Sequence, residues 1–153
     1  MNVKAKISPD DIARACAEAM WREDDASKGL GMKIIEVKPG QATLSMKVQP
    51  QMVNGQRIAH GGFIFTLADS ALAFASNSHN DKAVAAQGNI TFIRPGKLGD
   101  VLVATAREIS RNGRSGIYDV RVTAGDQVIA EFRGHSRTVA GRWLPHEIDG
   151  KQK

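Results

Sequence analysis

One carboxylate lies inside the most apolar segment of the sequence. Residues 61–77 are apolar at most positions, which predicts a helix buried on nearly all sides. Asp69 lies in the middle of this segment, and a buried carboxylate is costly unless it is paired or hydrated. Asp69 is therefore a candidate general base or nucleophile. A structural role, as a loop cap or as the partner of a strand arginine, would explain it equally well.

Two glycines begin the same helix. The sequence His60-Gly61-Gly62 predicts open N–H donors at the positive end of the helix dipole. Such donors can hold the oxygen of a polarised carbonyl, and glycine lets that group approach closely. The alternative is that the glycines only relieve crowding where the loop meets the helix.

The spacing of these groups limits how they can act together. Gly61 and Asp69 are eight residues apart, or about 12 Å along a helix axis. One chain therefore cannot bring both to the same carbonyl. If both act on one substrate, Asp69 must come from the antiparallel helix of a second copy, so the site would lie in a homodimer interface.

Other known catalytic patterns are absent from the sequence. There is no Gly-x-Ser-x-Gly, no His-Glu-x-x-His, no phosphate loop and no cysteine pair for zinc. His79, His135 and His146 are scattered, and we expect them in surface or strand positions rather than as ligands. We therefore expect no metal and no separate cofactor.

The composition predicts one globular domain. The 153 residues are 42% apolar and 24% charged, typical of a soluble protein. With 21 basic and 16 acidic side chains the formal charge is +5, which favours an anionic partner. Few aromatic residues and no basic run argue against nucleic acid, and no apolar run predicts a membrane span or signal peptide. A lone Cys16 agrees with a cytoplasmic location, and its helical register indicates a packing role.

Hydrophobic periodicity predicts the elements around the central helix. Ser8-Pro9 predicts the start of a helix over about 9–22, and residues 23–29 are expected to break it. Two strands on either side of Pro39-Gly40, a loop from 50 to 59, the central helix over about 61–77 and four more strands follow, over 83–93, 100–110, 116–124 and 127–138. This order predicts an α+β domain over residues 1–140, with a polar C-terminal tail over 141–153. One helix cannot cover both faces of such a sheet, so an exposed edge or face is expected to pair with a second copy.

Several motifs resemble the PaaI group of hot-dog thioesterases. They are Val53-Asn54-Gly55, His60-Gly61-Gly62 through Asp69-Ser70-Ala71, Asn89 through Gly96, Gly99-Asp100, Gly116 through Val120 and Phe132-Arg133-Gly134. The likeness runs from about Asp25 to Arg137. It implies the hot-dog fold, in which an antiparallel sheet wraps a long central helix.

The resemblance also implies a chemistry. An acyl-CoA thioesterase of this group would use Asp69 to activate water or attack the thioester, and Gly61 and Gly62 to polarise the carbonyl. Asn54 and His60 would order the segment before the helix. The implied substrate is an arylacyl-CoA, namely phenylacetyl-CoA or hydroxyphenylacetyl-CoA, cleaved to the free acid and CoA. Family members are often homotetramers built from two dimers, whereas the helix spacing itself requires only a dimer.

Two parts of the implied site stay open. Related animal proteins carry a serine that could hold water at the position of Ala85, so the group that positions water here could be Thr66 or Ser70. These residues, with Asp69, Ala73 and Asn77, are spaced to form one narrow stripe on the helix. The CoA phosphates suit arginines on turns, which indicates Arg94, Arg111 and Arg114, next to the turn glycines Gly96 and Gly113. Each arginine alone could equally be a surface charge.

Two other functions compete with thioester hydrolysis. A non-catalytic acyl-CoA binding or sensing protein could use the same fold, with Asp69 in a structural role. A hydratase or dehydratase would need an acid and base pair, such as an aspartate with a histidine, on the acyl chain. His60 is better placed to order the start of the helix.

Overall fold

The computed structural model describes residues 6–145. The chain forms three α-helices, one short 3-10 helix and six strands within that range, in an order close to the predicted one. They are α1 (Pro9–Glu23), α2 (Asp25–Gly29), β1 (Lys33–Lys38), β2 (Gln41–Lys47), η1 (Pro50–Met52), α3 (Gly61–Ser76), β3 (Asp81–Phe92), β4 (Val101–Asn112), β5 (Ser115–Ala124) and β6 (Gln127–Arg142).

Helix α1 begins as its sequence predicts, and the segment after it does not. The Ser8 side chain accepts a hydrogen bond from the Asp11 N–H, and Pro9 occupies the first turn. The predicted break at residues 23–29 is wrong in part, because residues 25–29 form the short helix α2. Asp24 starts this helix by accepting a hydrogen bond from the Ser27 N–H at 2.9 Å. One side chain thus caps a helix too short for periodicity to reveal.

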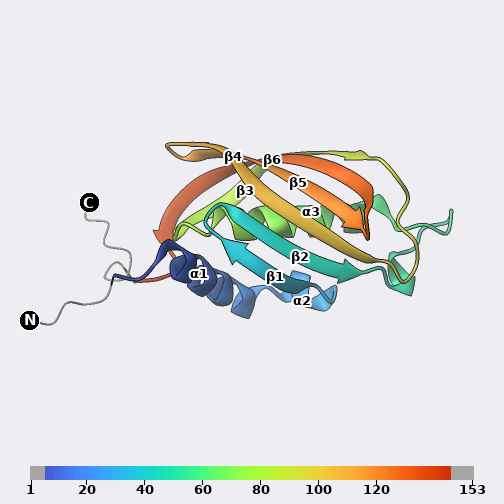
Figure 1. Ribbon diagram of the computed structural model, residues 1–153, viewed down its shortest axis with the longest axis horizontal. Coiled ribbons are helices and arrows are strands. Elements are labelled where there is room, and N and C mark those ends of the chain that lie inside the picture. The colour runs from blue at the N-terminus through green and yellow to red at the C-terminus, as the bar shows by residue number, and fades with distance from the viewer. Residues whose placement is uncertain (1–5, 146–153) are drawn as a thin grey trace, which may run out of the picture.

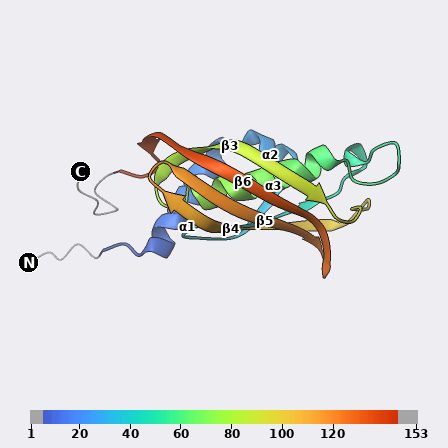
Figure 2. The ribbon, with the colours of Figure 1, turned by 90° about the horizontal axis from the view of Figure 1, so that it is seen from above.

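The six strands form one antiparallel sheet in the order β1-β2-β4-β5-β6-β3. The sheet curves around α3, and α1 and α2 lie beside β1 (Figure 1; Figure 2). Helix α3 contacts all six strands. This confirms the predicted α+β hot-dog fold.

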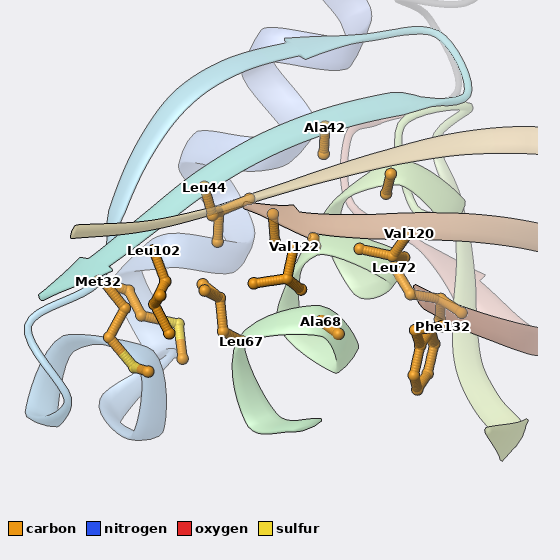
Figure 3. Close-up of a cluster of buried hydrophobic side chains, with 14 of the residues drawn as sticks. Met32, Ala42, Leu44, Leu67, Ala68, Leu72, Leu102, Val120, Val122 and Phe132 are labelled. Carbon is orange, nitrogen blue, oxygen red and sulfur yellow. The ribbon is translucent and has the colours of Figure 1, made fainter. Parts of the chain in front are cut away.

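The core lies between α3 and the concave face of the sheet. Leu67, Ala68 and Leu72 of the helix point toward side chains of the strands (Figure 3), and all three are fully buried. A side chain at Gly134 of β6 would collide with Leu72, so glycine there lets the helix approach the sheet. Phe74 is also buried. These contacts fix α3, and therefore the position of Asp69, against the sheet.

Strand β3 forms a long exposed edge. It has 12 residues, and its only neighbour in the sheet is β6. Val84 and Phe92 of this strand are 51% and 52% exposed. Its outer N–H and C=O groups can therefore pair with another strand.

The C-terminal part of the chain continues the domain beyond residue 140. β6 extends to Arg142, and the Trp143 Nε1–H donates to Asn77 Oδ1 at 2.8 Å. The Leu144 N–H donates to Asn80 Oδ1, also at 2.8 Å. Residues 141–145 of the predicted tail are thus held on the domain, and residues 146–153, which include His146, lie outside the described residues.

The structure bears on the predicted role of Cys16 and on the prediction that no segment spans a membrane. Cys16 is fully buried in α1, in agreement with a packing role. Among residues 6–145, no helix has the length and apolar content needed to cross a membrane.

Candidate active site

The start of α3 is capped by His60. Its Nδ1 accepts a hydrogen bond from the Gly62 N–H at 2.9 Å, and its carbonyl accepts one from the Phe63 N–H at 3.0 Å. The expectation that both glycine N–H groups are open is therefore wrong for Gly62, because the histidine side chain occupies its donor. No acceptor among residues 6–145 takes the Gly61 N–H. Gly61 is thus the donor left for a carbonyl oxygen at this helix end.

Gly61 lies beneath an aromatic ring of the exposed strand. A Cβ at this position would lie 2.6 Å from Cζ of Phe92, so any other residue would have to displace that ring. A cavity of about 420 Å³ opens beside it, lined by Asn54, Ile58, Ala59, Gly61, Ile64, Phe92, Ile93, Arg94 and Pro95. The sequence did not indicate Phe92 as a site residue. The one feature that could have pointed to it is its position two residues before Arg94.

Asn54 and His60 hold the segment before α3 in place. Asn54 Oδ1 accepts hydrogen bonds from the N–H groups of Gln56 and Ile58, at 3.0 and 3.3 Å. The His60 N–H donates to the Met52 carbonyl at 2.7 Å. The loop is thus tied at both of its ends, which fixes one wall of the cavity.

Asp69 is half-buried in the middle of α3. Burial raises the pKa of its carboxyl group above the ordinary aspartate value. Its side chain forms no hydrogen bond and no ion pair with any of residues 6–145. Neither the loop cap nor the arginine partner considered from the sequence is therefore found in that part of the chain.

The structure keeps Gly61 and Asp69 on one helix. Both lie in α3, so the separation of about 12 Å along its axis applies. Within one chain, the N–H donor and the carboxylate cannot reach the same carbonyl.

The predicted polar stripe on α3 separates into groups with different partners. Thr66 Oγ1 donates to the Gly62 carbonyl at 2.8 Å, and Ser70 Oγ lies 3.0 Å from Oγ of Ser27 in α2. Asn77 is 1% exposed and accepts from the Ala83 N–H at 2.9 Å. Of these three polar side chains, only that of Thr66 is hydrogen-bonded within α3 alone.

The residues predicted to bind CoA phosphates lie at two ends of the molecule. Arg94 and Gly96 follow β3 near Gly61, whereas Arg111, Gly113 and Arg114 lie at the β4–β5 turn (Figure 1). The 12 residues of β4 separate the two groups by about 36 Å. Within a single chain the two groups therefore cannot hold the same phosphate, and which of these arginines binds CoA stays a prediction.

Further contacts show what several of these residues do. The Gly96 carbonyl accepts from the Ala59 N–H at 2.8 Å, so Gly96 supports the cavity wall. Gly113 has a φ of 58°, which a tight turn requires. Arg114 Nε donates to the Thr138 carbonyl at 3.2 Å. Arg94 is exposed and lines the cavity beside Gly61.

The histidines away from α3 have other surroundings. His79 Nε2 lies 3.0 Å from Glu108 Oε1, which also accepts from the Tyr118 hydroxyl at 2.8 Å. His135 lies on β6 and is exposed. Across residues 6–145, no three His, Cys, Asp or Glu side chains gather in a way that could hold a metal ion.

Comparisons with known proteins agree with this geometry. The family model described as the thioesterase superfamily matches residues 56–131. The acyl-coenzyme A thioesterase PaaI of Escherichia coli is 42% identical over 126 residues, which cover 82% of this chain and 90% of that protein.

Solved structures show the same likeness. The E. coli PaaI protein from the phenylacetic acid degradation operon matches with a TM-score of 0.86 at 40% identity, over 88% of this chain and 99% of that one. A Streptococcus mutans protein solved with acetyl-CoA matches with a TM-score of 0.70 at 28% identity, over 72% of this chain and 90% of that one.

The raised pKa of Asp69 predicts a stability effect. Its folded-state pKa exceeds the unfolded one, so between the two values the folded protein binds more protons and loses stability as the pH rises. Asp69→Asn should therefore melt at a higher temperature than wild type at pH 7. The difference should shrink as the pH falls through the raised pKa of the folded protein toward the ordinary aspartate value. Thermal melts of both proteins from pH 4 to 8 measure this, and a wild type that is more stable at pH 7 would contradict it.

Proposed function

Because the chain belongs to the thioesterase superfamily, we propose that it hydrolyses an arylacyl-CoA, phenylacetyl-CoA or hydroxyphenylacetyl-CoA, to the free acid and CoA. The observation that carries this proposal is Asp69, a half-buried carboxylate without a partner among residues 6–145. Its relative in E. coli is an acyl-CoA thioesterase, and that protein comes from the phenylacetic acid degradation operon. Both names support the arylacyl substrate class.

We place the reaction at the interface of a homodimer. The Gly61 N–H of one chain polarises the thioester carbonyl, and Asp69 of the second chain reaches the same carbon from its antiparallel helix. Two such dimers form the tetramer that the family resemblance implies. The long exposed edge of β3 supports the pairing, because a second β3 would satisfy its free backbone groups.

The proposed dimer would have its two-fold axis near the middle of α3. If Gly61 of each chain faces Asp69 of the other, the axis passes midway between them, at the level of Phe65. A Cβ at Gly88 of β3 would lie 3.0 Å from Cζ of Phe65 in the same chain, so β3 lies beside the helix at this level. The absence of a side chain at Gly88 lets the helix approach its own strand closely.

The chemistry needs only water and groups that the chain supplies. Either the oxygen of water forms a bond to the thioester carbon while Asp69 takes a proton from it, or the Asp69 carboxylate forms that bond itself and water then cleaves the resulting anhydride to release the acid. The negative charge on the carbonyl oxygen is held by the Gly61 N–H. The bond from carbon to sulfur then breaks, and CoA leaves as the thiolate. A raised pKa makes the Asp69 carboxylate a stronger base than an exposed aspartate.

We propose that Arg94 binds a phosphate of CoA. Its side chain is exposed at the cavity beside Gly61. Its Nη1 donates to the Val128 carbonyl at 3.4 Å, and the other N–H groups of the guanidinium can bind phosphate oxygens. Arg111 and Arg114 could reach the same CoA only from a neighbouring subunit.

The activity can be tested by thiol release. Wild type should release CoA from phenylacetyl-CoA and hydroxyphenylacetyl-CoA faster than from acetyl-CoA or long-chain acyl-CoA. Asp69→Asn should lose about a hundredfold or more in kcat, the contribution of a general base. A wild type that binds these esters without cleaving them would favour the acyl-CoA sensor, and hydration of an enoyl-CoA without cleavage would favour a hydratase.

The shared site predicts complementation between two inactive variants. Gly61→Val places a side chain against Phe92 and closes the donor position, and Asp69→Asn removes the carboxylate. When the two variants are unfolded together and refolded at equal concentration, half of the dimers are mixed, and each mixed dimer has one intact site. About a quarter of the wild-type activity should return. If the two groups act within one chain, the mixture stays as inactive as its components.

The role of Arg94 predicts a change in substrate binding. Arg94→Ala should raise KM for acyl-CoA about tenfold with little change in kcat, because it removes one charged hydrogen bond to a group remote from the reaction. The matched variant is the double substitution Arg111→Ala and Arg114→Ala. An unchanged KM for Arg94→Ala together with a raised KM for the double variant would move the phosphate site to the neighbouring subunit's β4–β5 turn.

A further inference from the structure

We propose that Thr66 positions the attacking water, by accepting a hydrogen bond from it while Asp69 takes its other proton. This inference rests on the proposed function. It names the residue that positions water, which the sequence left open between Thr66 and Ser70. Ala73 and Ala85 have no polar side-chain atom, so neither can hold a water. Thr66 and Ser70 carry the hydroxyl groups nearest to Asp69 along α3.

The hydrogen bonds of Ser70 direct it toward α2. Ser27 Oγ donates its only proton to Asp24 Oδ2 at 2.7 Å, so the 3.0 Å contact between Ser27 and Ser70 requires Ser70 to be the donor. Ser27 is 1% exposed. Ser70 therefore donates its proton to the buried Ser27. Its side chain leaves the helix about 100° around the axis from that of Asp69.

Thr66 is placed differently. It precedes Asp69 by three residues in α3, so the two side chains are neighbours on the helix surface, about 60° apart around its axis. Its hydroxyl proton is committed to the Gly62 carbonyl at 2.8 Å. The oxygen of Thr66 can consequently accept a hydrogen bond but has no proton left to donate. Like Asp69, it is partly exposed.

These two acceptors determine the orientation of a water between them. The water donates one hydrogen to Thr66 Oγ1 and the other to the Asp69 carboxylate, so a lone pair of its oxygen faces the thioester carbon. As the oxygen bonds to that carbon, Asp69 takes the proton. The carbon–sulfur bond then breaks, and the thiolate that leaves takes this proton from Asp69. The carboxylate and the Thr66 hydrogen bond are thereby restored for the next water.

The hydroxyl of Thr66 can be tested with near-isosteric variants. Thr66→Val keeps the branched shape and loses the oxygen, and Thr66→Ser keeps the oxygen. Thr66→Val should lower kcat for hydrolysis about tenfold, the loss of one oriented hydrogen bond, with KM little changed. Thr66→Ser should recover most of this loss. Ser70→Ala is the matched control, which should stay within about twofold of wild type.

Competition between water and hydroxylamine distinguishes a role of Thr66 in positioning water from general damage to the fold. Hydroxylamine is a stronger nucleophile than water and depends less on being oriented, so the ratio of hydroxamate to free acid should rise in Thr66→Val and stay unchanged in Ser70→Ala. Equal losses of both products, or unchanged hydrolysis in Thr66→Val, would overturn the role of Thr66 while a slow Asp69→Asn keeps the thioesterase proposal. If Asp69→Asn is itself fully active, the role of Asp69 fails together with that of Thr66, and if wild type cleaves no acyl-CoA, the proposed function itself fails.

Discussion

The contact between α3 and the concave face of the sheet is the constraint on which the structure depends. The helix is buried by strands that come from both halves of the chain, and Gly134 lets it approach the sheet closely. This burial provides the main driving force for folding. It also sets the surroundings of every group on the helix. A carboxylate placed in its middle loses hydration, and the pKa of Asp69 rises for that reason.

The same constraint divides the candidate site between chains. A rigid helix fixes the distance between its first N–H groups and its middle, and no side-chain movement can close about 12 Å. In the proposed reaction, the N–H of Gly61 and the carboxylate of Asp69 can therefore act on one carbonyl only across an interface. In the proposed dimer, the exposed edge of β3 provides a way to form that interface without a further element.

Much of this arrangement could be predicted from the sequence, because it depends on periodic patterns. The apolar run of α3 and the alternation of the strands set the fold, and the position of Asp69 within that run set the candidate base. The short helix α2 could not be found this way, since it depends on a single cap from Asp24. The occupied N–H of Gly62 depends on the rotamer of His60, which no spacing reveals.

The positions of the predicted CoA residues relative to one another could not be read from their residue types. Arg94 and Arg111 both lie at turns, and residue type alone does not say which end of a sheet a turn occupies. In an antiparallel sheet successive turns alternate between ends, so the long strand β4 carries Arg111 away from Gly61. Counting the strands between two turns would have separated them.

The exposed edge of β3 affects what happens to a newly synthesised chain before it meets a second copy. An unpaired strand with apolar side chains in solvent is a template for aggregation as much as for correct pairing. In the proposed dimer, the event that covers this edge also completes the catalytic groups. A subunit without a partner is then inactive and also prone to aggregate. Chaperones or proteases that recognise exposed strand edges would therefore act on the same subunits that cannot catalyse.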